Sequence, residues 1–182
     1  AWRAILPQAS PAEGVARAGE PGSRDPDAGG DRVENGGVLL APALRARLAQ
    51  ARKLVVFSGA GVSQESGLGT FRGPGGLWER FRPEELATPE AFARDPGLVW
   101  RWYASRFEAM REARPNPAHL VIARWGGRFP SLVVVTQNID RLHQRAGSRD
   151  VLELHGTVWE SRCTGCRRTR ATEDLLTEAG GT

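Results

Sequence analysis

The chain has 182 residues, of which 40% are hydrophobic and 25% are charged, a composition typical of one globular domain or one and part of a second. No apolar run approaches the roughly 18 residues that a membrane-spanning helix needs, and no signal peptide is recognisable, so we expect a cytoplasmic protein. The net charge of +4 comes from arginines scattered among acidic residues, which argues against a specific nucleic-acid partner.

Residues 1–37 form the first recognisable segment. They are rich in Ala, Gly, Pro and charged residues and show little apolar periodicity. Such a segment buries too little surface to offset its ordering entropy, so we predict a disordered leader. A targeting peptide is the weaker interpretation, because the segment contains too many acidic residues.

Helices and short apolar runs alternate along the rest of the chain. This alternation indicates an α/β fold with a mainly parallel sheet. Apolar spacing predicts the helices, with breaks at Pro89 and Pro96, and runs rich in Val and Leu predict buried strands. The expected helices are residues 39–51, 83–113 and 118–125, and the expected strands are residues 54–57, 132–136 and 151–154.

A glycine-rich segment follows the first predicted strand. Residues 59–63 read Gly-Ala-Gly-Val-Ser, and glycines at this place let the backbone approach a pyrophosphate. Gln64 holds the place of the third glycine in the dinucleotide-binding fingerprint, which argues against a hydride-transfer dehydrogenase. A tight turn between a strand and a helix would explain the same glycines. Further along this loop, the planar guanidinium of Arg72 is suited to a phosphate or a carboxylate.

Polar residues also follow the other two predicted strands. Residues 136–140 read Thr-Gln-Asn-Ile-Asp, and His155 comes directly after the third strand. Open α/β sheets bind ligands at the carboxyl ends of their strands, so these side chains are candidates for one site. A lone histidine is more often structural than catalytic, but this one shares a sheet edge with the other candidates.

Five motifs in order resemble the sirtuin family. Each motif alone is weak, but their order and spacing make the resemblance specific from about Leu54 to Cys166. One departure is Gly69, where the family commonly has proline; glycine there should loosen the cofactor loop without removing a contacting side chain. The motifs are residues 59–63, residues 70–73 (Thr-Phe-Arg-Gly), residues 136–140 with Leu142-His143 after them, residues 155–156 (His-Gly) and the Cys-x-x-Cys of residues 163–166.

The resemblance implies an incomplete Rossmann-like α/β domain that binds NAD. The implied activity is NAD-dependent deacylation of acylated-lysine proteins, which yields nicotinamide and 2′-O-acyl-ADP-ribose. An inactive module that holds NAD or ADP-ribose, and a sirtuin-type mono-ADP-ribosyltransferase, would use the same contacts and stay open as alternatives. The implied parts are the leader (1–37) and a partial catalytic domain (38–182), comprising an NAD part (38–82 and 126–157), a helical insertion (83–125) and the start of a zinc module (158–182).

The family's residue roles carry over to the matching positions of this sequence. By resemblance His155 is the catalytic base, and an imidazole suits proton transfer near neutral pH. The acyl-amide oxygen would attack C1′ of the nicotinamide ribose as nicotinamide leaves, and the imidazole would then draw a proton from the ribose hydroxyls. The implied NAD-binding residues are Gly59, Ala60, Gly61, Ser63, Thr70, Phe71, Arg72, Gln137, Asn138 and Asp140.

Tyr103 and Arg106 are the implied substrate-binding residues. They lie three apart in a predicted helix and therefore on one face of it. They match the Tyr-x-x-Arg of the sirtuin class that resembles desuccinylases and demalonylases, in which both contact a carboxylate on the acyl chain. A preference for succinyl or malonyl groups over acetyl follows from the match. A helix that carries one amphipathic aromatic and one surface arginine is the structural alternative.

Cys163 and Cys166 match the first half of the family's structural zinc site. Tetrahedral zinc takes four ligands, and no Cys or His follows Cys166, so only half of a site is expected. A redox Cys-x-x-Cys is the rival interpretation, although the helix-like, Arg-rich sequence that follows does not resemble a thioredoxin active-site turn. The missing second cysteine pair leads us to expect a fragment or a truncated gene product.

Overall fold

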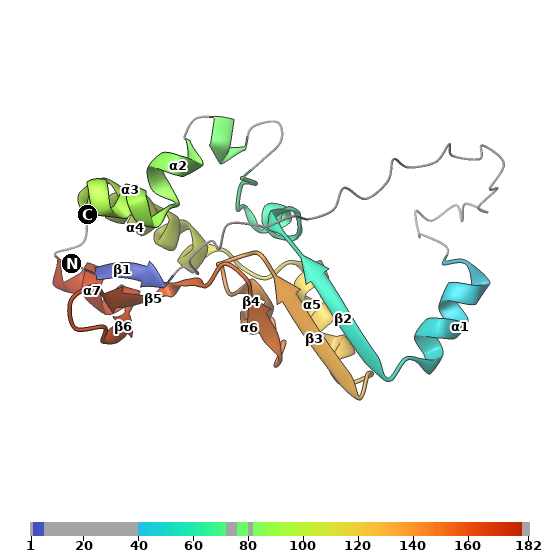
Figure 1. Cartoon of the computed structure of the whole chain (residues 1–182). Coiled ribbons are helices and arrows are strands. Elements are labelled where there is room, and N and C mark those ends of the chain that lie inside the picture. The colour runs from blue at the N-terminus through green and yellow to red at the C-terminus, as the bar shows by residue number, and fades with distance from the viewer. Residues whose placement is uncertain (1, 6–39, 72–75, 80–81, 180–182) are drawn as a thin grey trace. The chain divides into compact units, whose positions relative to one another are not determined.

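The computed structural model describes residues 2–5, 40–71, 76–79 and 82–179, which form two compact units (Figure 1). The smaller unit spans residues 10–52, and its described part contains one helix, α1 (Pro42–Gln50). The helix begins at a proline, whose missing amide is not needed in the first turn, and it lies within the predicted helix of residues 39–51. The larger unit comprises residues 1–9 and 53–182 and contains the other elements.

A three-stranded parallel sheet lies in the larger unit. Its strands β2 (Lys53–Ser58), β3 (Ser131–Thr136) and β4 (Val151–Glu153) pair in the order β2-β3-β4. Each strand agrees with the corresponding predicted strand to within a residue or two at either end. The predicted α/β class and parallel sheet are therefore confirmed.

The two faces of this sheet differ in exposure. Val55 pairs with Val133 across the parallel ladder, and because side chains alternate along a strand, Val55 and Phe57 share one face. Both side chains are largely exposed, at 58% for Val55 and 70% for Phe57. Val134, on the opposite face of the same sheet, is fully buried. The face that carries Val134 is therefore packed more fully than the other face, on which Val135, the partner of Phe57, is nevertheless buried.

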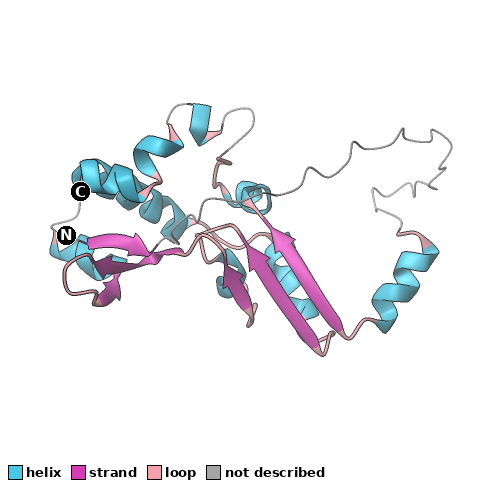
Figure 2. Cartoon of the chain, viewed as in Figure 1, coloured by secondary structure: helices cyan, strands magenta, loops and turns pink. Residues whose placement is uncertain are grey.

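The larger unit also contains an antiparallel sheet. Its strands β1 (Trp2–Ile5), β5 (Thr157–Cys163) and β6 (Thr169–Ala171) pair in the order β1-β5-β6 (Figure 2). The structure differs here from the predicted leader, because Trp2–Ile5 completes an edge of β5 instead of being disordered. Residues 6–37 of that leader lie outside the described residues.

The predicted helical stretch of residues 83–113 is divided at both expected prolines. It forms α2 (Pro83–Leu86), α3 (Pro89–Arg94) and α4 (Pro96–Glu112), and each helix begins at a proline. The side chains of Thr88 and Asp95 accept hydrogen bonds from the amides of Ala91 and Leu98, at 3.0 and 2.9 Å, and so cap α3 and α4. Proline and a capping side chain together explain why the breaks were predictable.

Helix α4 supplies much of the hydrophobic core. Phe107 and Met110 on its inner face are 1% and 2% exposed and pack in one cluster with Leu142 and Val158. None of the described helices is long and apolar enough to cross a membrane. The other helical elements are α5 (Pro117–Trp125), α6 (Leu142–Arg145), α7 (Thr172–Glu178) and the 3₁₀ helices η1 (Ala60–Ser66) and η2 (Leu77–Glu79).

The asymmetry of the parallel sheet gives a test with two matched variants. Val134→Ala removes buried methyl groups, and we expect it to lower the free energy of unfolding by about 1–3 kcal/mol. Val55→Ala makes the same change in strand propensity at an exposed position. It should lower the free energy of unfolding by less than about 1 kcal/mol. Urea unfolding followed by circular dichroism measures both. Equal losses would mean that the face containing Val55 and Phe57 is covered.

Candidate functional site

The site is built where the three parallel strands end. The amide of Gln137 donates to the carbonyl oxygen of Ser58 at 3.0 Å, and the amide of Leu154 donates to that of Thr136 at 2.8 Å. These two bonds extend the strand ladder by one step at the carboxyl edge. The glycine segment, residues 136–140 and His155 therefore lie beside one another, as the sequence predicted.

A buried network of polar side chains connects the first two of these segments. The side-chain nitrogen of Asn138, Nδ2, donates to the carbonyl oxygen of Gly59 at 3.1 Å and to the Ser63 hydroxyl at 3.0 Å. The Ser63 hydroxyl in turn donates to one carboxylate oxygen of Asp140 at 2.7 Å. The other oxygen of Asp140 accepts the amide of Leu142 at 2.9 Å. Asn138, Ser63 and Asp140 thus hold the loop after β3 against η1.

The backbone of the glycine segment faces open space. A Cβ atom added to Gly59 or Gly61 would meet nothing within 4 Å, so packing does not require glycine at either position. Gly67 has a φ of 84°, a left-handed conformation that suits glycine, and it ends η1. Ala60 begins η1, which is a 3₁₀ helix and not the α-helix typical of dinucleotide-binding folds.

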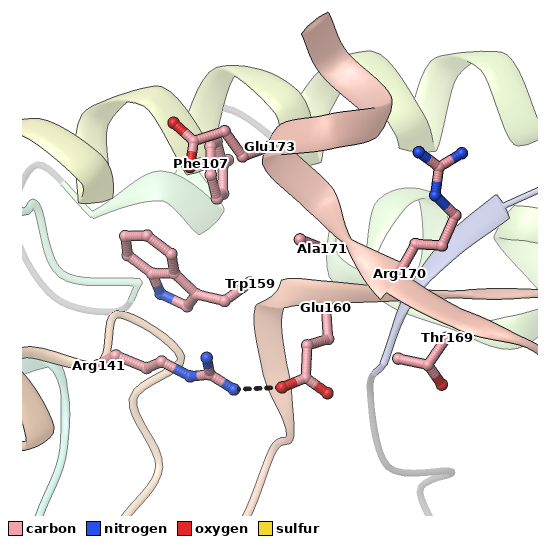
Figure 3. Close-up of a pocket in the computed structure, with 8 residues that line it drawn as sticks. All are labelled: Phe107, Arg141, Trp159, Glu160, Thr169, Arg170, Ala171 and Glu173. Atoms are coloured by element: carbon pink, nitrogen blue, oxygen red, sulfur yellow. Dashed lines mark hydrogen bonds and ion pairs between the residues drawn. The ribbon is translucent and has the colours of Figure 1, made fainter. Parts of the chain in front are cut away.

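Arg141 follows Asp140 in a left-handed conformation, with a φ of 57°. A residue with a Cβ is strained there, and specific contacts must hold it. Its guanidinium makes an ion pair of 2.9 Å with Glu160 on β5 and a longer one of 3.8 Å with Glu153. Figure 3 shows the first pair beside a cavity of about 420 Å³ whose apolar wall includes Trp159.

Tyr103 and Arg106 lie on one face of α4, where Tyr103 is buried and Arg106 is half-buried. Burial raises the pKa of the Tyr103 hydroxyl and lowers the pKa of the Arg106 guanidinium. The guanidinium lies over the ring of Phe71, 5.5 Å from its centroid. Arg106 makes no ion pair with a carboxylate in the described part of the chain, and its buried Nε has no hydrogen-bond partner there. A cation in this setting suits an anionic ligand.

The remaining predicted NAD and catalytic positions are exposed, partly buried in the case of Thr70, or outside the described residues. His155 is exposed in the turn after β4, where Gly156 has a φ of 68°, and Gln137 is exposed at the end of β3. The carbonyl oxygen of Thr70 accepts the amide of Leu77 at 3.0 Å, which closes the loop before η2. Arg72 lies outside the described residues.

Cys163 and Cys166 lie at the turn between β5 and β6. The turn closes through a bond of 3.0 Å from the amide of Arg167 to the carbonyl oxygen of Cys163. Arg168 Nε donates to the Cys166 sulfur at 3.4 Å, and this bond lowers the pKa of that thiol to about 7. Residues 167–171 form a turn and β6, so their helix-like appearance in the sequence was misleading.

A tetrahedral zinc ion takes four ligands, of which Cys163 and Cys166 could supply two. No group of three or more His, Cys, Asp or Glu side chains able to hold a metal occurs among the described residues. Thiolate ligands suit zinc, and the position of both sulfurs on one turn fits a pair of ligands. The described residues therefore fit two of the four ligands.

Asn116 has a structural role that was not recognised from the sequence. It caps α5 in a capping box in which His119 takes the place usually held by Glu or Gln. Its side-chain nitrogen also donates to the carbonyl oxygen of Val62 at 2.7 Å. This bond connects the start of α5 to η1. The Asn-Pro pair at residues 116–117 was the available signal for the cap, but nothing local indicated the contact with Val62.

Comparison with known proteins gives consistent results. Residues 59–180 match the Sir2 family. The chain is 63% identical over 119 residues to NAD-dependent protein deacylase 2 of Pyrobaculum aerophilum, covering 65% of this chain and 48% of that protein. It is 52% identical over 133 residues to the mitochondrial NAD-dependent protein deacylase sirtuin-5 of Danio rerio, covering 71% of this chain and 44% of that protein.

Solved structures show the same similarity. A crystal structure of a Sir2 homolog–NAD complex superposes with a TM-score of 0.68 at 48% identity and covers 75% of this chain and 54% of that one. The chain therefore spans about half the length of the relatives it matches.

Proposed function

Because this chain belongs to the Sir2 family, we propose that its protein is an NAD-dependent deacylase acting on acylated lysines of other proteins. The observation that carries the proposal is the meeting of Gly59, Asn138 and Asp140 at one sheet edge, with His155 exposed beside them. Since the chain spans about half of its relatives, the reaction is proposed for the whole protein. We keep a cytoplasmic location as a proposal, supported by bacterial and archaeal relatives but not by the mitochondrial sirtuin-5 proteins.

NAD would lie along the carboxyl edge of the parallel sheet. The open backbone of Gly59 and Gly61 leaves room for its phosphates, and Asn138 and Asp140 are held beside the expected place of the ribose. Bound NAD supplies a ribose carbon that the acyl oxygen can attack. The residues proposed to hold it are Gly59, Ala60, Gly61, Ser63, Thr70, Phe71, Arg72, Gln137, Asn138 and Asp140.

The three buried residues of the NAD set, Ser63, Asn138 and Asp140, have an orienting role. Asp140 uses both carboxylate oxygens within the protein, and Asn138 has its amide nitrogen engaged twice. Their exposed neighbour Gln137 and the exposed imidazole of His155 are free to meet a ligand from the solvent side. His155 would accept the proton that the ribose hydroxyl loses when the acyl group migrates.

We further propose a preference for acyl chains that end in a carboxylate. A succinyl or malonyl carboxylate must lose water to enter an apolar acyl site, and an unpaired charge there is costly. Arg106 offers a partly buried cation without a carboxylate partner among the described residues, and the Tyr103 hydroxyl offers a second donor. A neutral acetyl group would leave that guanidinium without a partner.

Cys163 and Cys166 are proposed as two ligands of a structural zinc ion. The short turn between β5 and β6 and the lowered pKa of the Cys166 thiol support this assignment. The division of residues 38–182 into an NAD part, a helical insertion and the start of a zinc module remains part of the same proposal.

The first prediction concerns His155. His155→Ala should lower the rate of deacylation about a hundredfold or more, because the reaction loses its base, while ADP-ribose affinity stays within a few-fold. Rates and calorimetric binding would be measured on the chain and on a chimera that joins it to the second half of the Pyrobaculum relative. Arg149→Ala, a change at an exposed position before β4 and so at the other end of that strand, is the control. Normal turnover by His155→Ala would overturn the assignment, and binding without turnover by the unmodified chimera would favour an inactive NAD-binding module.

A second prediction concerns acyl choice. Arg106→Met should lower kcat/KM for a succinyl peptide, because a buried carboxylate loses its partner. The expected decrease corresponds to a loss of about 2–4 kcal/mol of transition-state binding energy. The value for an acetyl peptide should change little or rise. Arg101→Met is the matched control, since Arg101 lies on the exposed side of the same helix. Equal losses for the two peptides would show that Arg106 is structural.

The third prediction concerns zinc. Two thiolates leave half of the coordination shell to water, so the purified 182-residue chain should hold far less than one zinc per chain after dialysis against a chelator. Elemental analysis of the chain and of Cys166→Ser measures this. A monomeric chain that keeps one zinc through dialysis would contradict the half-site.

A further inference from the structure

Two buried histidines pack against each other next to Ser58, the last residue of β2, and the proposed reaction uses neither of them. His119 on α5 is 0% exposed, and His143 on α6 is 1% exposed. Their rings lie edge to face, with centroids 4.8 Å apart and planes at 60°. Side chains of this kind are usually placed inside a protein only where their nitrogens have defined partners.

The hydrogen bonds around His143 fix its tautomer. The Ser58 hydroxyl gives its single proton to Thr136 Oγ1 at 2.9 Å. The contact of 2.9 Å between Ser58 Oγ and His143 Nε2 must then have the imidazole as donor. A neutral His143 is therefore the tautomer protonated on Nε2, in which Nδ1 carries a lone pair.

The same reasoning applies to His119. Its Nδ1 accepts the backbone amide of Asn116 at 3.3 Å, so the proton of a neutral ring is again on Nε2. His119 Nε2 and His143 Nδ1 are both buried, and neither has a hydrogen-bond partner among the described residues. One is a donor and the other an acceptor, so two neutral rings are chemically complementary. A proton on His143 Nδ1 would instead place two N–H donors and a charge in the same buried contact.

Thr136 connects this pair to the cofactor residues. Its Oγ1 accepts the backbone amide of Asn138 at 3.1 Å in addition to the Ser58 hydroxyl. Asn138 then holds Gly59 through its side chain. A continuous chain of hydrogen bonds thus links His143 through Ser58 and Thr136 to the backbone of Asn138, with Thr136 Oγ1 accepting from both sides.

We propose that His119 and His143 form a neutral imidazole pair that positions Ser58, Thr136 and Asn138 for NAD binding, an inference that rests on the proposed function. The pair acts through Asn138 and has no contact with the reacting atoms. The titratable groups around it favour the neutral state on balance. Burial and then His119 lower the pKa of His143 to about 4, against an opposing effect of Asp140, and burial also lowers the pKa of His119.

Two variants of His143 separate positioning from simple packing. His143→Phe keeps a flat ring but removes the donor to Ser58, whereas His143→Gln retains an N–H donor on the side chain. Loss of one hydrogen bond in the line should speed exchange of the Asn138 amide and weaken ADP-ribose binding, each by up to about tenfold. His143→Gln should retain most of the protection of the Asn138 amide and most of the affinity for ADP-ribose.

The test combines nitrogen-15 spectra of the imidazoles, hydrogen exchange at Asn138 and calorimetry with ADP-ribose, all on the unmodified 182-residue chain and the two variants. We expect both buried rings to be neutral and protonated on Nε2 at pH 7 and at pH values about one unit lower. An Nδ1-protonated or charged ring at neutral pH would overturn the inference, as would unchanged Asn138 exchange in His143→Phe. If His143→Phe does not fold, the tautomers of the unmodified chain still decide. A chain with the expected tautomers that fails to bind ADP-ribose would count against the NAD proposal and leave the pair standing.

Discussion

The in-register parallel pairing of β2, β3 and β4 is the constraint on which the rest of the site depends. Parallel strands end at the same edge, and two further backbone hydrogen bonds carry the register past the last paired residues. Segments that are about 80 residues apart in sequence, such as Gly59 and Asn138, are brought within a hydrogen bond of each other. A slip of β3 by one residue would turn Thr136 to the other face relative to β2 and break its link to Ser58.

Burial divides the candidate cofactor residues into two groups with different tasks. Asn138, Ser63 and Asp140 are buried and satisfy one another, so removing any one would leave a polar group inside the protein without a partner. Gln137 and His155 are exposed and make few demands on the fold. The first group gives the edge its shape, and the second is available for chemistry. Chemical roles inferred from a family motif alone do not distinguish the two.

Much of the fold could be predicted because its signals are local. Pro89 and Pro96 with their capping residues mark helix starts, and the apolar runs mark strands, although only β3 is largely buried as predicted and β2 is exposed on one face. The antiparallel strands β1, β5 and β6 were missed. β1 pairs with a segment near the other end of the chain, and β6 is short and pairs with β5 in a local hairpin of polar, Arg-rich sequence. The motif carrying Leu142-His143 was visible in the sequence, but the contact of His143 with Ser58 depends on tertiary structure. The same applies to Arg106. Its spacing from Tyr103 could be read from the sequence, but its lack of a carboxylate partner among the described residues depends on tertiary structure.

The left-handed backbone of Arg141 has a mechanical consequence. An ion pair holds this strained residue to Glu160 in the antiparallel sheet, while its peptide neighbour Asp140 is bonded to Ser63 beside the parallel sheet. Displacement of β5 would therefore pull on Arg141 through its ion pair with Glu160. The two sheets are thus linked at this point, because one peptide bond joins Arg141 to Asp140, whose carboxylate accepts the Ser63 hydroxyl.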